Sequence, residues 1–357
     1  MLNRSAARCA KRVKYGEVVQ RRNPRFNGAG ACDRKEGSVD EALSASDLRD
    51  DQSCLDAARG SFAVSPHGAA GALHERVQFR ESGDTLPEPQ LRPGVGLKSR
   101  QLIVEGVSLE ALRVGEGETV LILHDVEYVN EPRLFIESLA ERFAVVAPSH
   151  PGFGSSELLS GFDSAEDIAD LYLDLLDEIG PAHVIGMGFG GWLAAEMAVR
   201  CIHNMLNLVL VDAVGIKTAG RETAEIADTF VMYPGEFLQC AWHDPARAEA
   251  HMKLPGLGTH SEDELRTLLR NRESAALFGW NPFMHNPKLR RRLRRIKVPT
   301  LVIWGESDGV VSVEYGRAYA ESIPGARLEI IKAAGHYPQL EQPDRFVEIV
   351  TEFLKRE

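Results

Sequence analysis

The chain has 357 residues, of which 44% are hydrophobic and 26% charged, and its net charge is −11. This composition is typical of a globular protein and excludes a wholly disordered or a fibrous chain. An acidic surface repels phosphate, so we expect no nucleic-acid partner for the folded part.

The cysteines stand at positions 9, 32, 54, 201 and 240, without the spacing of a metal site. Their odd number and wide separation favour a reducing compartment, so we expect a cytoplasmic protein without structural zinc. The sequence has no apolar run of about 18 residues and no apolar segment near its start, so we expect neither a membrane span nor a secretory signal. We also expect no cofactor and no bound metal.

Residues 1–98 show neither helical nor strand periodicity. They are rich in Arg, Ser, Gly, Asp and Ala, which predicts a disordered N-terminal extension. The first 35 residues carry 10 Lys or Arg and 2 acidic residues. That bias fits a transit peptide or a nucleic-acid-binding arm, and it also fits an extension without selected structure.

From residue 101 onward, short apolar runs alternate with segments of helical periodicity. Continuous runs of Val, Ile and Leu are typical of parallel strands, which are buried on both faces. The alternation therefore predicts an α/β fold with a doubly wound, mostly parallel sheet. The predicted strands are residues 101–106, 108–114, 118–124, 143–148, 183–187, 206–212, 299–305 and 326–332.

Helical periodicity is clearest in two of the intervening segments. From Ile168 to Ile179 the apolar residues share one helical face, after Asp163 or Ser164 as the N-cap. Pro343 suits the first position of the last helix, whose apolar stripe is Phe346, Ile349, Val350, Phe353 and Leu354.

One long segment, residues 214–296, interrupts the alternation and reads as largely helical and polar. An insertion at the carboxyl ends of the strands covers the crevice where open α/β sheets bind ligands, so we interpret it as a helical cap. The core then consists of residues 99–213 and 297–357. The basic run at residues 288–297 predicts a solvated amphipathic helix, with inward-facing Leu289, Leu293 and Ile296.

The segment HVIGMGFGGWLAAEMAVR, residues 183–200, reads as a strand, a tight glycine turn and a helix. In the pattern G-x-S-x-G at such a turn, the serine is an exposed nucleophile. Here Gly188 stands at the serine position, and glycine has no oxygen that could carry an acyl group. The glycines also match G-x-G-x-x-G weakly, but the acidic residue that a dinucleotide site needs about 20 residues further on is missing.

The chain resembles the α/β-hydrolase superfamily, in particular members with an AB hydrolase-1 domain and a cap, over roughly residues 100–356. The resemblance rests on the glycine turn within residues 183–200 and on residues 121–126, 149–157, 304–311 and 333–343. It implies that Asp308 is the acid and His336 the base of a triad whose nucleophile position, Gly188, is vacant. A carboxylate that accepts from one imidazole nitrogen leaves the other nitrogen basic. Asp212, which ends its strand, is a second candidate acid.

The oxyanion hole implied by the resemblance takes one backbone N–H from Phe189 and one from the loop after the third predicted strand. In that loop Asp125, Val126 and Glu127 stand where glycine is usual, and we take Asp125 and Val126 as candidates. Two carboxylates beside a developing oxyanion would oppose it unless they point away or are protonated.

Aromatic residues in the cap and at its mouth favour a small apolar or aromatic substrate or ligand. The pocket candidates are His124, Trp280 and Phe283. Three hypotheses then stay open. The first is catalysis by the His336–Asp308 dyad without a covalent serine, through hydrolysis, carbon–carbon cleavage or proton abstraction. The others are a silent pseudoenzyme that binds a ligand or protein, and an inactivated serine hydrolase.

Overall fold

A computed structural model describes residues 99–126, 134–252, 254, 256 and 258–355. The predicted extension, residues 1–98, lies outside this part, as does Glu127. Within the described part, no helix is long and apolar enough to cross a membrane.

The architecture is built on one eight-stranded sheet, in the order β1-β2-β4-β3-β5-β6-β7-β8. The predicted α/β fold is confirmed, and every predicted strand is present. From β4 to β8 the neighbouring strands are parallel, whereas β2 pairs antiparallel with both β1 and β4. The strands are β1 Ser99–Val104, β2 Val107–Val114, β3 Thr119–Leu123, β4 Ala144–Pro148, β5 Ala182–Met187, β6 Met205–Val211, β7 Thr300–Gly305 and β8 Arg327–Ile331.

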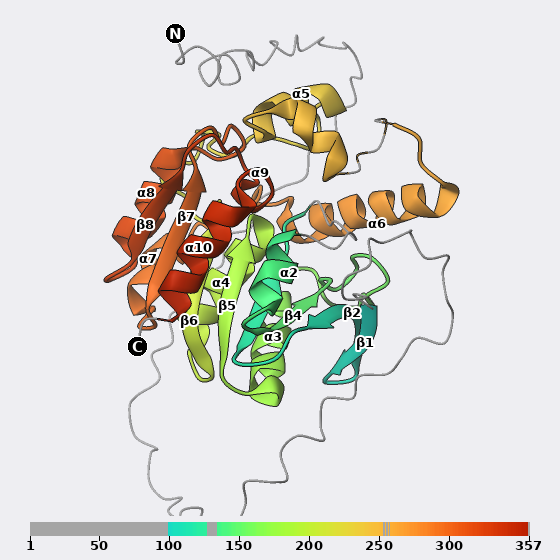
Figure 1. Cartoon of the computed structure of the whole chain (residues 1–357). Helices are drawn as coiled ribbons and strands as arrows, with labels where there is room; N and C mark the ends of the chain where they lie inside the picture. Colours follow the sequence, from blue (N-terminus) through green and yellow to red (C-terminus); the bar gives the residue numbers. More distant parts are fainter. Residues whose placement is uncertain (1–98, 127–133, 253, 255, 257, 356–357) are drawn as a thin grey trace, which may run out of the picture. The chain divides into compact units, whose positions relative to one another are not determined.

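Helices cover both faces of the sheet (Figure 1). One hydrophobic cluster joins α3, α4 and α8 to the sheet, and the other joins α2, α9 and α10 to it. Successive strand residues alternate between the two clusters, as Leu121 and Ile122 do in β3. The helices are α2 Leu134–Ala140, α3 Ala165–Ile179, α4 Phe189–Arg200, α8 Val313–Ser322, α9 Pro338–Glu341 and α10 Pro343–Leu354.

The predicted starts of two helices are confirmed. Ser164 caps α3 in a capping box with Asp167, so two backbone N–H groups that have no partner within the helix are satisfied. Pro343 begins α10, whose predicted apolar stripe is buried.

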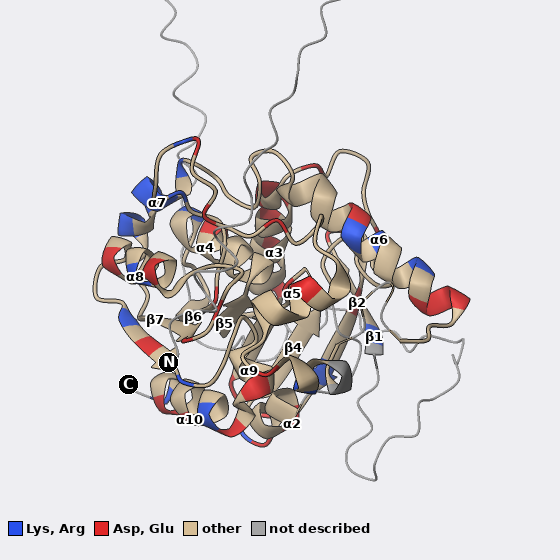
Figure 2. Ribbon diagram, turned by 90° about the horizontal axis from the view of Figure 1, so that it is seen from above, with Lys and Arg blue, Asp and Glu red and all other residues tan. Residues whose placement is uncertain are grey.

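The insertion between β6 and β7 contains α5 Pro234–Ala241, η1 Pro245–Ala250, α6 Glu262–Gly279, α7 Leu289–Arg292 and η2 Leu293–Arg295. Figure 1 places α5 and α6 at one end of the sheet. By contrast, α7 and η2 pack against the core helices α4 and α8. Figure 2 shows the Lys and Arg positions along α7 in blue at the periphery of the molecule. Arg291, Arg294 and Arg295 are exposed, whereas Arg292 pairs with the buried Glu196. Leu289, Leu293 and Ile296 are fully buried, as predicted. The helix itself is shorter than its basic run suggested.

Candidate active site

The candidate residues gather at the carboxyl edge of the parallel strands. Asp125 follows β3, Gly188 follows β5, Asp212 follows β6, Asp308 follows β7 and His336 follows β8. Ligands of open α/β sheets bind at this edge, and the fold thus brings together residues that are far apart in sequence.

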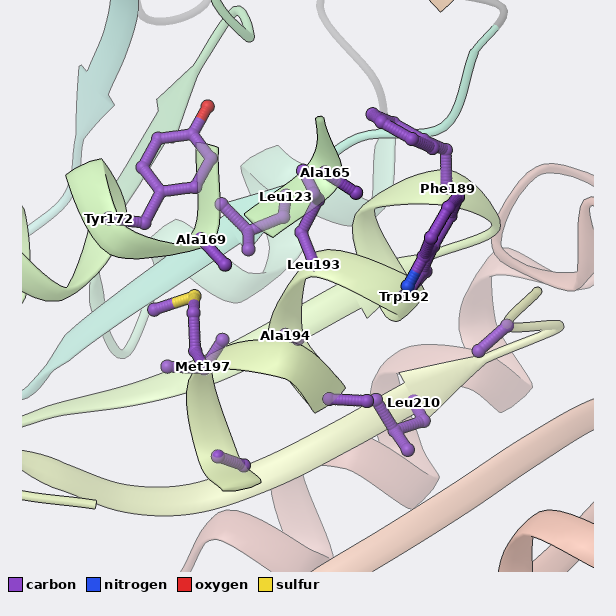
Figure 3. Packing of buried hydrophobic residues seen from close by; sticks show 14 of the residues in the cluster. Leu123, Ala165, Ala169, Tyr172, Phe189, Trp192, Leu193, Ala194, Met197 and Leu210 are labelled. Atoms are coloured by element: carbon purple, nitrogen blue, oxygen red, sulfur yellow. The ribbon is translucent and has the colours of Figure 1, made fainter. Parts of the chain in front are cut away.

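The turn between β5 and α4 is a tight elbow at Gly188, whose φ is +50°. Glycine is also required at position 190, where the start of α4 approaches the end of β3. A Cβ on Gly190 would lie 2.2 Å from the Leu123 carbonyl oxygen. The Phe189 ring is fully buried and meets Trp192 edge-on at 5.8 Å (Figure 3). This packing fixes the first turn of α4, and with it the direction of the Phe189 N–H.

The predicted acid and base form a buried pair. The Nδ1 atom of His336 lies 2.8 Å from Oδ2 of Asp308. The other oxygen of Asp308 accepts hydrogen bonds from the backbone N–H groups of Val310 and Val311, at 2.8 and 3.0 Å. These bonds hold the carboxylate in place, so it in turn holds the imidazole ring with Nε2 directed away from Asp308.

Asp125 lies on the other side of this imidazole. Its Oδ2 atom is 3.4 Å from Nε2 of His336, and its Oδ1 atom accepts from the Phe189 N–H at 2.7 Å. The backbone N–H of Val126 also helps to lower the pKa of this carboxylate. The Phe189 N–H, a candidate donor of the oxyanion hole, therefore bonds to the side chain of Asp125, which occupies the hole as an acceptor.

Protonation states follow from this arrangement. Burial lowers the pKa of His336, but the charge of Asp308 and hydrogen bonds to Asp125 and Asp308 outweigh it and raise that pKa well above 6.5. Burial raises the pKa of Asp125, but the hydrogen bond and charge of His336 outweigh it, and the net pKa is lowered. The resting site is thus an imidazolium between two carboxylates.

Asp212 is the second carboxyl group beside this pair. Burial, followed by the charge of Asp308, raises the pKa of Asp212 well above 3.8, which favours the neutral form of its carboxyl. Its Oδ1 atom accepts from the Gly305 N–H at 2.9 Å. Asp212, Asp308 and His336 each offer one possible ligand atom for a metal ion. These three atoms lie within 4.8 Å of one another. Hydrogen bonds to one another and to the backbone already use most of these atoms, so we interpret the cluster as a hydrogen-bonded group around the His336–Asp308 pair.

A pocket opens between this cluster and the insertion, and Asp125 and His336 lie in its wall. Of the described residues that line it, none is Lys or Arg. A neutral, apolar ligand therefore fits the pocket best. The apolar lining includes Val126, Ile226, Phe237, Phe283, Met284 and Val310.

Two of the three pocket candidates lie elsewhere. Phe283 lines the pocket, but His124 and Trp280 are not among the lining residues. Trp280 is 55% exposed and packs edge-on against the outer side of Phe283 at 6.3 Å. The His124 ring instead stacks on His150 at 3.8 Å.

This histidine pair anchors the loop that carries Asp125, a role that the sequence did not indicate. Nε2 of His150 donates to the His124 carbonyl oxygen at 2.8 Å, so Nδ1 accepts from the Tyr172 hydroxyl at 2.7 Å. The Gly190 N–H donates to the same carbonyl at 3.0 Å. The β3 loop is thereby tied both to α3 and to the start of α4.

The buried His150 makes stability depend on pH. Burial lowers the pKa of His150 to about 4, whereas in the unfolded chain it is near 6.5, so the unfolded state takes up the proton first as the pH falls. We expect this group alone to lower the free energy of unfolding by about 2 kcal/mol between pH 7 and pH 5. Urea unfolding at both pH values measures the loss, and the His150→Gln variant should lack that part of it. An equal loss in the variant would exclude this role.

Glu341, which the sequence analysis missed, positions the histidine turn. Its buried carboxylate accepts from the Gly335 N–H at 2.6 Å, the Asp244 N–H at 3.0 Å and the His243 N–H at 3.2 Å. These bonds link the residue before His336 to the segment after α5. The sequence offered one signal, an acidic residue close after a glycine-histidine turn.

We expect Glu341→Gln to lower the free energy of unfolding by about 1–3 kcal/mol, because an amide has one acceptor oxygen for three donors. It should also lower kcat with little change in KM, since the pocket itself is untouched. Thermal unfolding and steady-state kinetics measure both effects. The matched control is Glu348→Gln on α10, where the side chain is 64% exposed and no change is expected. An equal effect of both variants would contradict the positioning role.

Comparison with known proteins supports the fold. The model of the family described as "Alpha/beta hydrolase family" matches residues 120–349. The 2-hydroxy-6-oxononadienedioate/2-hydroxy-6-oxononatrienedioate hydrolase of Burkholderia vietnamiensis is 29% identical over 236 residues, which are 60% of this chain and 77% of that protein. The 2-hydroxymuconate semialdehyde hydrolase of Pseudomonas putida is 28% identical over 283 residues, 74% of this chain and 96% of that one.

A solved structure shows the same similarity. The meta-cleavage product hydrolase CumD from Pseudomonas fluorescens IP01, in the crystal structure of a point variant, superimposes with a TM-score of 0.56 at 28% identity. The match covers 71% of this chain and 96% of that one.

Proposed function

The chain belongs to the alpha/beta hydrolase family, and from this premise we propose that it hydrolyses a small, neutral, apolar or aromatic molecule without forming a serine ester. The observation that carries the proposal is the buried contact of 2.8 Å between His336 and Asp308 in the wall of the pocket, beside a nucleophile position that has no side chain. A ligand-binding protein gains nothing from such a pair, whereas a proton-transfer catalyst depends on it.

The relatives support a small-molecule substrate, because those named above are hydrolases of small organic compounds. Their exact substrates do not transfer to this chain. The names ending in dioate denote dicarboxylates, and the described lining of this pocket has no Lys or Arg to bind them. A neutral substrate is the better fit.

A turnover screen tests the proposal. It uses neutral aromatic p-nitrophenyl esters, lactones, epoxides and vinylogous diketones, with the wild type and His336→Ala in parallel. We expect at least one class to be hydrolysed by the wild type and lost in His336→Ala. His243→Ala is the matched control, because His243 bonds Ser307 at 2.8 Å and is not in the pocket lining. Turnover that survives in His336→Ala, or its absence in every class, would refute the proposal.

The hypothesis of a silent pseudo-hydrolase is the second candidate. It is favoured by the hydrogen bond of the Phe189 N–H to Asp125, which leaves this donor unavailable to a substrate carbonyl. Silence of the wild type together with ligand binding in the pocket would favour it. An inactivated serine hydrolase fits less well, because Asp125 takes the space that a serine side chain would need.

A further inference from the structure

The position left empty by Gly188 is filled from another part of the chain. A Cβ built on Gly188 would lie 2.0 Å from Oδ1 of Asp125 and 2.2 Å from its Cγ. The carboxylate of Asp125 and a side chain at position 188 therefore exclude each other. In this chain the reactive group beside His336 comes from the loop after β3 and not from the elbow.

The two oxygens of this carboxylate have different surroundings. Oδ1 accepts from the Phe189 N–H at 2.7 Å, while Oδ2 is directed to Nε2 of His336 at 3.4 Å. In an ester, one oxygen is a carbonyl that needs an oxyanion hole when water attacks, and the other carries the alkyl group. Oδ1 already lies where the carbonyl oxygen of such an ester would need to be.

The carboxylate is also held rigidly and is accessible. The bonds of the His124 carbonyl to His150 and Gly190 fix the loop immediately before Asp125. The side chain itself is 12% exposed and lines the pocket. A preorganised, ionised carboxylate at the wall of an apolar pocket is a nucleophile with little solvent to displace.

We propose that Asp125 is the covalent nucleophile of this protein, and that its substrate is a neutral epoxide. This inference rests on the proposed hydrolytic function and specifies its substrate class. Attack at a saturated carbon forms no oxyanion on a substrate carbonyl, so the substrate needs no oxyanion hole. This suits a site whose oxyanion-hole donor, the Phe189 N–H, already bonds to Asp125. The leaving oxygen of an epoxide needs a proton, and His336 holds one beside Oδ2.

The proposed reaction balances in two steps. In the first, Oδ2 of Asp125 forms a bond to an epoxide carbon, the ring carbon–oxygen bond breaks, and the ring oxygen takes the proton from Nε2 of His336. In the second, neutral His336 takes a proton from water as the water oxygen attacks Cγ of Asp125, whose Oδ1 remains bonded to Phe189. The bond from Cγ to the alkyl oxygen then breaks. The second proton of the water passes to this alkyl oxygen, so a diol leaves, and the imidazolium of His336 and the carboxylate of Asp125 are restored.

The test is a single turnover of styrene oxide in water labelled with heavy oxygen, with the wild-type protein in excess. We expect unlabelled diol from this first turnover and one heavy oxygen in the peptide that contains Asp125, read by mass spectrometry. Asp125→Asn should lose diol formation at least about a hundredfold. Asp228→Asn is the matched control and should keep it, because Asp228 flanks the pocket but is not among its lining residues.

The outcomes separate this inference from the proposed function. Heavy oxygen in the diol, or full activity in Asp125→Asn, would overturn the covalent role while His336-dependent hydrolysis stands. Failure of styrene oxide to react, with another substrate class hydrolysed, would overturn the epoxide assignment alone. Silence in every class would refute both.

Discussion

Replacing Asp308 by asparagine is expected to lower kcat/KM about ten-thousandfold. The side-chain amide would donate to Nδ1 of His336, which fixes the wrong tautomer and removes the charge that most strongly raises the pKa of this imidazole. With Nδ1 as the acceptor, the neutral imidazole keeps its proton on Nε2, so Nε2 can no longer take a proton from water. Steady-state kinetics on the best substrate of the screen measures the loss.

Asp212→Asn is the matched control for this prediction. The raised pKa of Asp212 favours its neutral carboxyl form, and an amide oxygen can still accept from the Gly305 N–H. We therefore expect a loss below about tenfold. Equal losses in the two variants would show that Asp212, and not Asp308 alone, is the acid of the site.

Gly188→Ser is expected to destabilise the protein by about 3 kcal/mol and to produce no esterase. The backbone at φ +50° disfavours a side chain, and the new Cβ would lie 2.0 Å from Oδ1 of Asp125. The carboxylate must then leave the Phe189 N–H. Denaturant unfolding measures the loss of stability.

The double variant Gly188→Ser/Asp125→Gly tests the cause. Removal of the carboxylate frees both the space and the Phe189 donor of the oxyanion hole, so we expect a recovery of about 2 kcal/mol relative to the sum of the single variants. We also expect a burst of p-nitrophenol from p-nitrophenyl acetate in the double variant only. A burst in Gly188→Ser alone would show that Asp125 does not block the elbow.

The fold was predictable from local patterns. Strand-like apolar runs identified all eight strands. The signal was strongest for β3, β5, β6 and β7, which are almost entirely buried, since strands buried on both faces leave little room for polar residues. The capping pattern at Ser164 and the proline at Pro343 located the starts of α3 and α10 for equally local reasons. The insertion carries similar local signals, Pro234 at the start of α5 and the capping box of Ser261 and Glu264 at the start of α6, which the sequence analysis missed.

The site was predictable only in part. The order of the turns pointed to Asp308 and His336, and these side chains lie in contact. The sequence located Asp125 near the oxyanion hole but not the direction of its carboxylate, which depends on the stack of His124 on His150 and on the open space at Gly188. Glu341 likewise acts through three backbone N–H groups that only the folded chain brings together.

The protonation state of His336 tests the central claim, that Asp125 takes the nucleophile's place beside the His336–Asp308 pair. Proton NMR of the wild type and Asp125→Asn across neutral pH measures it without a substrate. We expect His336 to remain an imidazolium well above its ordinary pKa in the wild type, and its pKa to fall in Asp125→Asn because one of its two carboxylate partners is gone. A titration near pH 6.5 or so in both proteins would contradict the account.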